Sequence, residues 1–167
     1  MITMTRPQAP ARDAMLYVTG RTAPTVAASR IVVGQIVPWD VPGRPTGYPG
    51  PVRFAAHSLD LESLADAPLL LDHEPSRPIG IVAGAWDTAD ELRASWRVAD
   101  TQAGSDALTL VELGARSGLS VGAIVQDYVL QAETDTEVPE LVVLSALVRE
   151  VSLLTFPAYR TARASRP

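Results

Sequence analysis

Three residues of the types that carry acyl-transfer chemistry are spread along the chain: His73, Ser120 and Glu150. Imidazole titrates near neutrality, so His73 could act as a general base. A serine hydroxyl beside such a base becomes a nucleophile when donors for the developing oxyanion are at hand. A carboxylate that accepts from the imidazole would hold its tautomer. The three types therefore fit a Ser–His–acid triad, whose members meet in space rather than in sequence.

Each of the three residues also has a purely structural interpretation. His73 ends the aliphatic segment LLLDHE and could simply leave the core for solvent. Ser120 lies in SGLSVG, and serine beside glycine is common in turns. Glu150 could reach water at the edge of a sheet. The residue types alone do not decide between these interpretations and the triad.

Glu150 is the most informative of the three. We expect a strand over 141–154, and the face that carries Glu150 is otherwise almost entirely apolar. A carboxylate on such a face is costly unless it is paired or hydrogen-bonded. Arg149 projects from the opposite face, so it is a poor partner. An imidazole N–H would serve, which favours a His73–Glu150 pair.

The pattern around Ser120 predicts a strand start. Over 119–126 the apolar residues Leu119 and Val121 alternate with Ser120 and Gly122. Gly122 shares the serine's face and has no side chain, so another backbone or a substrate could approach there. A nucleophilic serine needs such access.

The composition excludes several classes of site. There is no cysteine, so disulfides, thiolate nucleophiles and cysteine-ligated metals are excluded. All 14 basic residues are arginine, which excludes lysine Schiff bases and Ser–Lys dyads. His57 and His73 are the two histidines, and Asp72 next to His73 would point to the other face of a strand, so we expect no metal and no cofactor. A net charge of −5 and a pI near 5.0 disfavour nucleic-acid binding.

The chain reads as one domain over 30–158, between a flexible N-terminal arm over 1–29 and a flexible C-terminal tail over 159–167. The arm could be partly ordered near 15–18. We expect no secretion signal and no membrane span, because the longest aliphatic run is short and is broken by Ser145. A soluble intracellular protein is the expectation.

Within this domain the pattern is mostly β. The first strand contains Gly34, which suggests a bulge. One helix is expected over 103–113, with Asp100 or Thr101 as its N-cap and Gly114 at its end. The strand over 141–154 is apolar on both faces and should be covered on both sides. Strands are expected over 30–38, 52–56, 67–73, 79–86, 91–99, 119–126 and 141–154, a helical turn over 59–65, and loops over 39–51 and 127–139. The fold class is thus mainly β with one or more helices (α+β), as a small closed or partly open β-barrel.

Four segments together resemble the prohead (capsid-maturation) serine proteases of tailed bacteriophages, of the Hong-Kong-97 type. In chain order, these segments span about 130 of the 167 residues. They are LLLDHEPSRPIGIVAG (69–84), VADTQAGSDALTLVELGARSGLSVGA (98–123), REVSLLTFPAY (149–159) and, more weakly, IVVGQIVPWDVPG (31–43) followed by VRFAAHSLDL (52–61).

The resemblance implies a β-barrel protease similar to the herpesvirus assemblins. His73 matches the family histidine after the aliphatic run and would be the general base, and Ser120 matches the nucleophile. Glu150 is the best match to the third member, where the assemblins use a second histidine. We expect His57 at the surface and keep it as the reserve for that role. Backbone N–H groups near Ser120, or an arginine, could form the oxyanion hole.

The resemblance also implies the partners. The substrates would be the scaffold region of the major capsid protein and the protease itself, with other prohead components nearby, in the host cytoplasm inside the immature capsid. Self-cleavage is expected within 1–29 or after Tyr159. Dimers occur among assemblins, and nothing in the sequence demands a homodimer. The alternatives are an inactive scaffold-like head component of the same fold and a small-ligand β-barrel.

Overall fold

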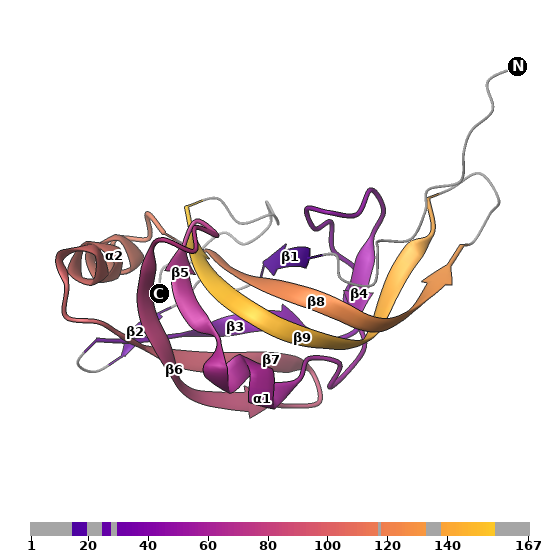
Figure 1. Cartoon of the computed structure of the whole chain (residues 1–167), viewed down its shortest axis with the longest axis horizontal. Coiled ribbons are helices and arrows are strands. Elements are labelled where there is room, and N and C mark those ends of the chain that lie inside the picture. Colours follow the sequence, from indigo (N-terminus) through magenta and orange to yellow (C-terminus); the bar gives the residue numbers. More distant parts are fainter. Residues whose placement is uncertain (1–14, 20–24, 28–29, 117, 133–137, 156–167) are drawn as a thin grey trace, which may run out of the picture.

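The computed structural model describes residues 15–19, 25–27, 30–116, 118–132 and 138–155. One strongly curled sheet of nine strands makes a half-barrel with two helices beside it (Figure 1). The strands are β1 (Met15–Thr19), β2 (Thr25–Ala27), β3 (Ile31–Pro38), β4 (Val52–Phe54), β5 (Pro68–Leu71), β6 (Pro78–Asp87), β7 (Glu91–Val98), β8 (Gly118–Gln131) and β9 (Glu140–Leu154). The helices are α1 (Leu61–Asp66) and α2 (Gln102–Glu112).

The two longest strands of the sheet, β8 and β9, pair antiparallel with each other. The strand order is β1-β8-β9-β5-β6-β7-β3-β2, and β4 also pairs with β9. β4 and β5 both run parallel to β9, β4 opposite 141–143 and β5 opposite 151–153. The chain between these two short strands includes α1 and crosses the middle of β9, where Leu59 bridges Ala146. Both ends of β9 are therefore flanked on both sides.

The buried hydrophobic side chains form one core cluster against the sheet. Along β8 the core face is made by Leu119, Val121, Ala123 and Val125, all of which are buried. Trp96 of β7 is the largest fully buried side chain. This alternation is the one expected for a strand with one face in the core. The fold class expected from the sequence, mainly β with helices and a partly open barrel, is confirmed.

The helix boundaries follow their capping residues. Asp60 accepts the Ser63 N–H at the start of α1. Thr101, one of the two expected N-caps, accepts the Gly104 N–H at the start of α2. Gly114 follows the end of α2 with φ of +73°, the left-handed conformation that favours glycine. The chain can then turn directly from α2 into β8.

Three local expectations were wrong. The bulge in β3 lies between Gln35 and Val37, whereas Gly34 pairs regularly with Ala94. β8 continues to Gln131 through register shifts near Asp127, which hide its alternation from the sequence. β9 is covered on both sides only at its ends. Leu144 and Leu147, near its middle, are exposed in the described structure.

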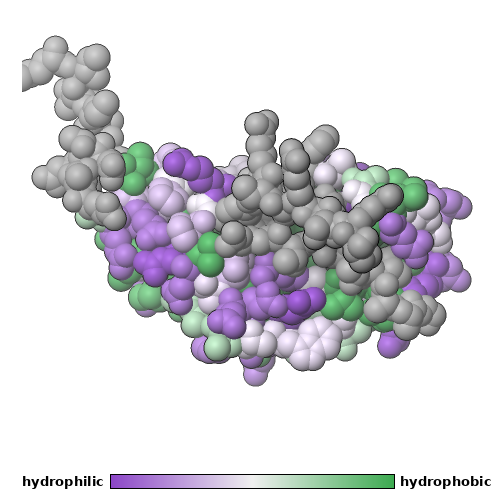
Figure 2. Space-filling view, turned by 180° about the vertical axis from the view of Figure 1, so that it is seen from behind, coloured by the Kyte–Doolittle hydropathy of each residue, from purple (hydrophilic) through white to green (hydrophobic). Residues whose placement is uncertain are grey.

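The outer surface is mixed in character. Hydrophobic patches are scattered among hydrophilic ones on the face opposite to that of Figure 1 (Figure 2). In the described part of the chain, no helix is long and apolar enough to cross a membrane. Two strands, β1 and β2, lie within the expected N-terminal arm. Most of that arm, and the expected tail over 159–167, lie outside the described residues.

Candidate active site

Strands β8 and β9 bring Ser120 and Glu150 to one face of the sheet. Ser120 pairs with Ser152, and the next pair on that face is Gly122 with Glu150. Residues directly opposite in an antiparallel ladder point the same way. Ser120 is only 2% exposed and Glu150 only 8%. The nucleophile and acid candidates thus lie on neighbouring strands, two residues apart along the face.

Gly122 makes room for the carboxylate of Glu150. A Cβ atom at this position would press against the carboxylate oxygen and would lie 3.1 Å from both Glu150 Cδ and Tyr17 Cε1. The sequence suggested that the missing side chain admits a backbone or a substrate. The structure instead fills the space with Glu150 and with the Tyr17 ring from β1.

His73 reaches the same face from the turn after β5. β5 runs parallel to β9 with Leu71 opposite Leu153, and the Asp72 N–H donates to the Leu153 carbonyl. Asp72 and His73 then take φ values of 56° and 60°. Residues with side chains seldom adopt this left-handed conformation, which is concentrated at functional sites. The expectation that the two side chains would alternate across a strand was wrong, because both residues lie in this turn.

The imidazole of His73 is bonded to Glu150. His73 Nδ1 lies 2.7 Å from Glu150 Oε1. An ionised carboxylate is only an acceptor, so Nδ1 carries the proton and donates it. In the neutral ring, Nε2 is then the nitrogen with a free lone pair. The Tyr17 ring packs against the imidazole with a centroid distance of 4.3 Å. This is the tautomer and restraint that a general base needs.

Ser152 completes the bonding of this pair. Its hydroxyl donates to Glu150 Oε2 over 2.7 Å and accepts the His73 backbone N–H over 3.1 Å. Both carboxylate oxygens of the buried Glu150 therefore have a donor. This offsets the cost of burying the charge.

Ser120 lies beside this pair. Within the described residues, no hydrogen bond joins the Ser120 hydroxyl to His73 or to another group. Catalytic hydrogen bonds are often long without substrate and tighten when substrate binds. Ser120, His73 and Glu150 therefore lie on one face of the sheet, and Nε2 is the imidazole nitrogen left free to accept a proton.

Asp72 carries charge next to the site without belonging to it. Arg116 binds both of its oxygens, and Arg77 binds Oδ2 at 3.1 Å. The hydrogen bonds from Arg116 hold the pKa of the Asp72 carboxyl below its ordinary value of 3.8, against the opposing effect of burial. Asp72 is therefore ionised at neutral pH.

His57 takes no part in this arrangement. Its side chain is 60% exposed and lies at the surface, where it was expected. Nδ1 of His57 pairs with Asp87 Oδ1 at 2.8 Å, and the Trp39 indole N–H donates to the same oxygen. Among the described residues, no group of three or more histidine or acidic side chains could hold a metal ion.

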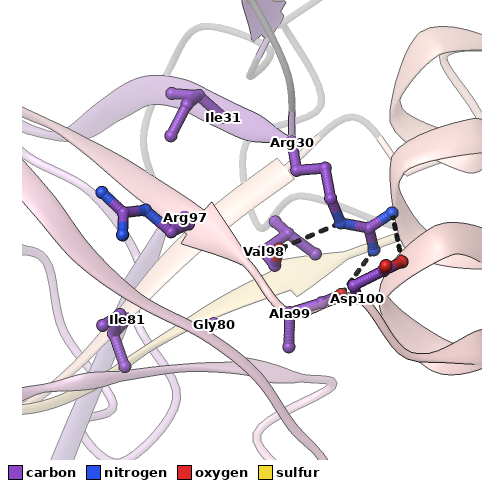
Figure 3. A pocket seen from close by; sticks show the side chains of 8 residues that line it. All are labelled: Arg30, Ile31, Gly80, Ile81, Arg97, Val98, Ala99 and Asp100. Carbon is purple, nitrogen blue, oxygen red and sulfur yellow. Dashed lines mark hydrogen bonds and ion pairs between the residues drawn. The ribbon is translucent and has the colours of Figure 1, made fainter.

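A cavity of about 720 Å³ lies elsewhere, between the ends of β3, β6 and β7 (Figure 3). Arg30 at its wall donates to the Val98 and Ala99 carbonyls and pairs with Asp100 at 3.2 Å. Its guanidinium is thus engaged by the protein itself. The lining residues do not include Ser120, His73 or Glu150, so this cavity is not part of the candidate active site.

The family follows from the sequence match. A model of the caudovirus prohead serine protease family matches residues 29–166. The chain belongs to this family. The resemblance found in the four sequence segments is confirmed at this level.

The fold of this prohead protease family member is also found in a solved structure. The structure of the bacteriophage T4 capsid assembly protease, gp21, matches with a TM-score of 0.57 and 14% identity. The match covers 86% of this chain and 98% of that one. At this identity the match shows the fold alone. No curated protein matches the sequence.

Two residues of the site in this prohead protease family member were missed from the sequence. Ser152 follows Glu150 by two positions on the same strand face, so the alternation could have identified it. Tyr17 lies in the expected arm, and no pattern in the sequence links it to His73. Its place depends on the pairing of β1 with β8, a contact between distant segments.

Proposed function

We propose that this chain is a capsid-maturation serine endopeptidase of the Hong-Kong-97 type. Its substrates are the scaffold region of the major capsid protein and the chain itself. The observation that carries the proposal is the His73–Glu150 hydrogen bond on the face where Ser120 lies. Membership of the prohead serine protease family supports the reaction class. The similarity in fold to the T4 capsid assembly protease supports a role in capsid assembly.

The mechanism is acyl transfer. Ser120 Oγ attacks a peptide carbonyl carbon while His73 Nε2 takes the hydroxyl proton. Glu150 accepts from Nδ1–H and offsets the charge of the imidazolium. The imidazolium gives its proton to the amine of the leaving peptide, and the C–N bond breaks. Water then attacks the acyl-serine with His73 again as base, which releases the acid product and restores Ser120.

The pairing of β1 supports a narrower proposal for the self-cleavage sites than the sequence alone. The expected ranges were 1–29 and the residues after Tyr159. β1 pairs with the strand of Ser120 and brings Tyr17 against His73. We propose that a cut which leaves the protease active lies before Met15 or after Tyr159, so that β1 stays in the sheet.

The proposal is tested by co-expression with the cognate major capsid protein. Wild type is compared with Ser120→Ala, and both proteins are read by intact mass spectrometry. We expect shortened capsid protein and shortened protease with wild type only. Cleavage by both forms would place the nucleophile elsewhere or indicate a host protease. Absence of cleavage in cells that assemble capsids would favour the inactive scaffold-like component.

A further inference from the structure

The turn that presents His73 needs support from outside itself. Asp72 and His73 are consecutive residues with positive φ, and neither is glycine. Within the turn, Glu74 N–H donates to the Leu71 carbonyl and Leu71 N–H to the Arg77 carbonyl. Local strain of this kind persists only when the surrounding structure fixes it.

Arg116 supplies such support through Asp72. Its Nη1 and Nη2 donate to Asp72 Oδ1 and Oδ2, each over 2.8 Å. The planar fork of a guanidinium matches a carboxylate in this bidentate geometry. The Arg116 side chain is 11% exposed, whereas that of Asp72 is 37% exposed. The pair is thus held at the edge of the protein interior and is not a freely moving surface contact.

The same guanidinium touches the strand that carries the acid. Arg116 Nη1 also donates to the Leu153 carbonyl of β9 over 2.8 Å, and the Asp72 N–H donates to that same carbonyl. Arg116 itself lies four residues before Ser120, in the short link from α2 to β8. One side chain therefore joins the segments that carry Ser120, His73 and Glu150.

We propose that Arg116, acting through Asp72, is a positioning residue that sets His73 relative to Ser120 and Glu150. The inference rests on the function proposed above. The hydrogen bonds of Arg116 go to Asp72 and Leu153, and among the described residues none goes to Ser120, His73 or Glu150. Its effect is to fix the left-handed turn, so that Nε2 of the bonded imidazole meets the serine hydroxyl. A misplacement of about 1 Å between reacting groups can cost about 100-fold in rate.

The first test uses a fluorophosphonate probe on the full chain, because phosphonylation needs an activated serine and no knowledge of the cleavage site. The second-order labelling rate is measured for wild type, Arg116→Gln, Arg116→Lys and Asp72→Asn. We expect the labelling rate of Arg116→Gln and of Asp72→Asn to be about 10- to 100-fold lower than that of wild type. The rate of Arg116→Lys should lie between those of wild type and Arg116→Gln, because an ammonium cannot bind both oxygens of Asp72 at once.

Arg53→Gln is the matched control. Arg53 also joins acidic partners, Asp40 and Glu140, but at the β4 end of β9, remote from His73. Its labelling rate should equal that of wild type. Full labelling in a folded Arg116→Gln, or an equal loss in Arg53→Gln, would overturn the inference.

The second test does not depend on activity. The proton on His73 Nδ1, bonded to Glu150, is followed by NMR at low temperature, with a His57→Gln background to remove the other imidazole. The signal should survive Arg53→Gln and be lost or displaced in Arg116→Gln. An unchanged signal in Arg116→Gln would overturn the positioning role. Failure of wild type to label at Ser120 would overturn the proposed function instead, and the NMR comparison would still decide the role of Arg116.

Discussion

Gly122 lies directly opposite Glu150 in the β8–β9 ladder, and the place of a side chain at 122 is occupied by the Glu150 carboxylate. The glycine and the acid are therefore one unit of the site. Ser120 is two residues before this glycine, so the same strand carries the proposed nucleophile and makes room for the carboxylate bonded to His73.

Gly122→Ala should damage both stability and activity. The new methyl would displace Glu150 or Tyr17, and overpacking of this kind typically costs about 1–3 kcal/mol. Thermal unfolding and fluorophosphonate labelling measure the two effects. Gly84→Ala in β6 is the control, because a Cβ there would lie 3.4 Å from Ser95 Oγ and meet no closer atom. Equal behaviour of the two variants would contradict the packing argument.

Glu150→Gln should leave the fold intact and lower the labelling rate by about 1,000- to 10,000-fold. The amide can donate to Nδ1 and so favour the tautomer with its proton on Nε2, which cannot take the serine proton. Glu140→Gln, on the same strand but paired with Arg53, should label at the wild-type rate. A loss of less than tenfold at Glu150 would argue against its role as third member.

Ser152→Ala should destabilise the protein by about 1–3 kcal/mol, because one oxygen of Glu150 and the His73 N–H lose their partner in the interior. Urea unfolding measures the change. Ser58→Ala is a close control: Ser58 is also buried, yet its hydroxyl has no hydrogen-bond partner in the described structure. That variant should be neutral. If Ser58→Ala lowered the free energy of unfolding and Ser152→Ala did not, the stabilising role given to the Ser152 hydrogen bonds would be refuted.

The Asp72–Arg116 pair predicts a pH dependence of stability. The pKa of Asp72 is lowered in the folded state, so its contribution is complete above the ordinary value of 3.8 and is lost as pH falls through the lowered pKa. Asp72→Asn should cost about 1 kcal/mol near neutrality, a small value because Asp72 is 37% exposed. The difference in free energy of unfolding between wild type and Asp72→Asn should be constant above about pH 5 and should decrease at lower pH.

A gap that stayed constant down to pH 2 would show that Asp72 acts through something other than its charge. Repeating the titration in an Arg116→Gln background provides the control. There the pH dependence attributed to Asp72 should be reduced, since Arg77 alone would remain as its partner.

Sequence patterns anticipated the elements around the site because local periodicity fixes them. The alternation over 119–125 predicted the face of Ser120, and the apolar surroundings of Glu150 predicted an imidazole partner, which the structure shows. Both inferences needed only the cost of burying polar groups and the two-residue period of a strand.

The parts that escaped prediction depend on contacts between distant segments. The Arg116–Asp72 pair spans 44 residues, and Tyr17 reaches His73 only because β1 pairs with β8. The extension of β8 to Gln131 was hidden by register shifts, which interrupt the alternation of polar and apolar residues. The left-handed turn at His73 has only a weak sequence signal: neither residue is glycine, although aspartate and histidine adopt this conformation more often than most other residues.

We propose above that Ser120, His73 and Glu150 act as one catalytic set. The most direct test is to treat the folded full chain with a fluorophosphonate and locate the adduct by peptide mass spectrometry, in wild type, His73→Gln and Ser120→Ala. We predict one adduct, on Ser120, that is lost in both variants. An adduct on another serine, or labelling of Ser120 at full rate in His73→Gln, would contradict the account.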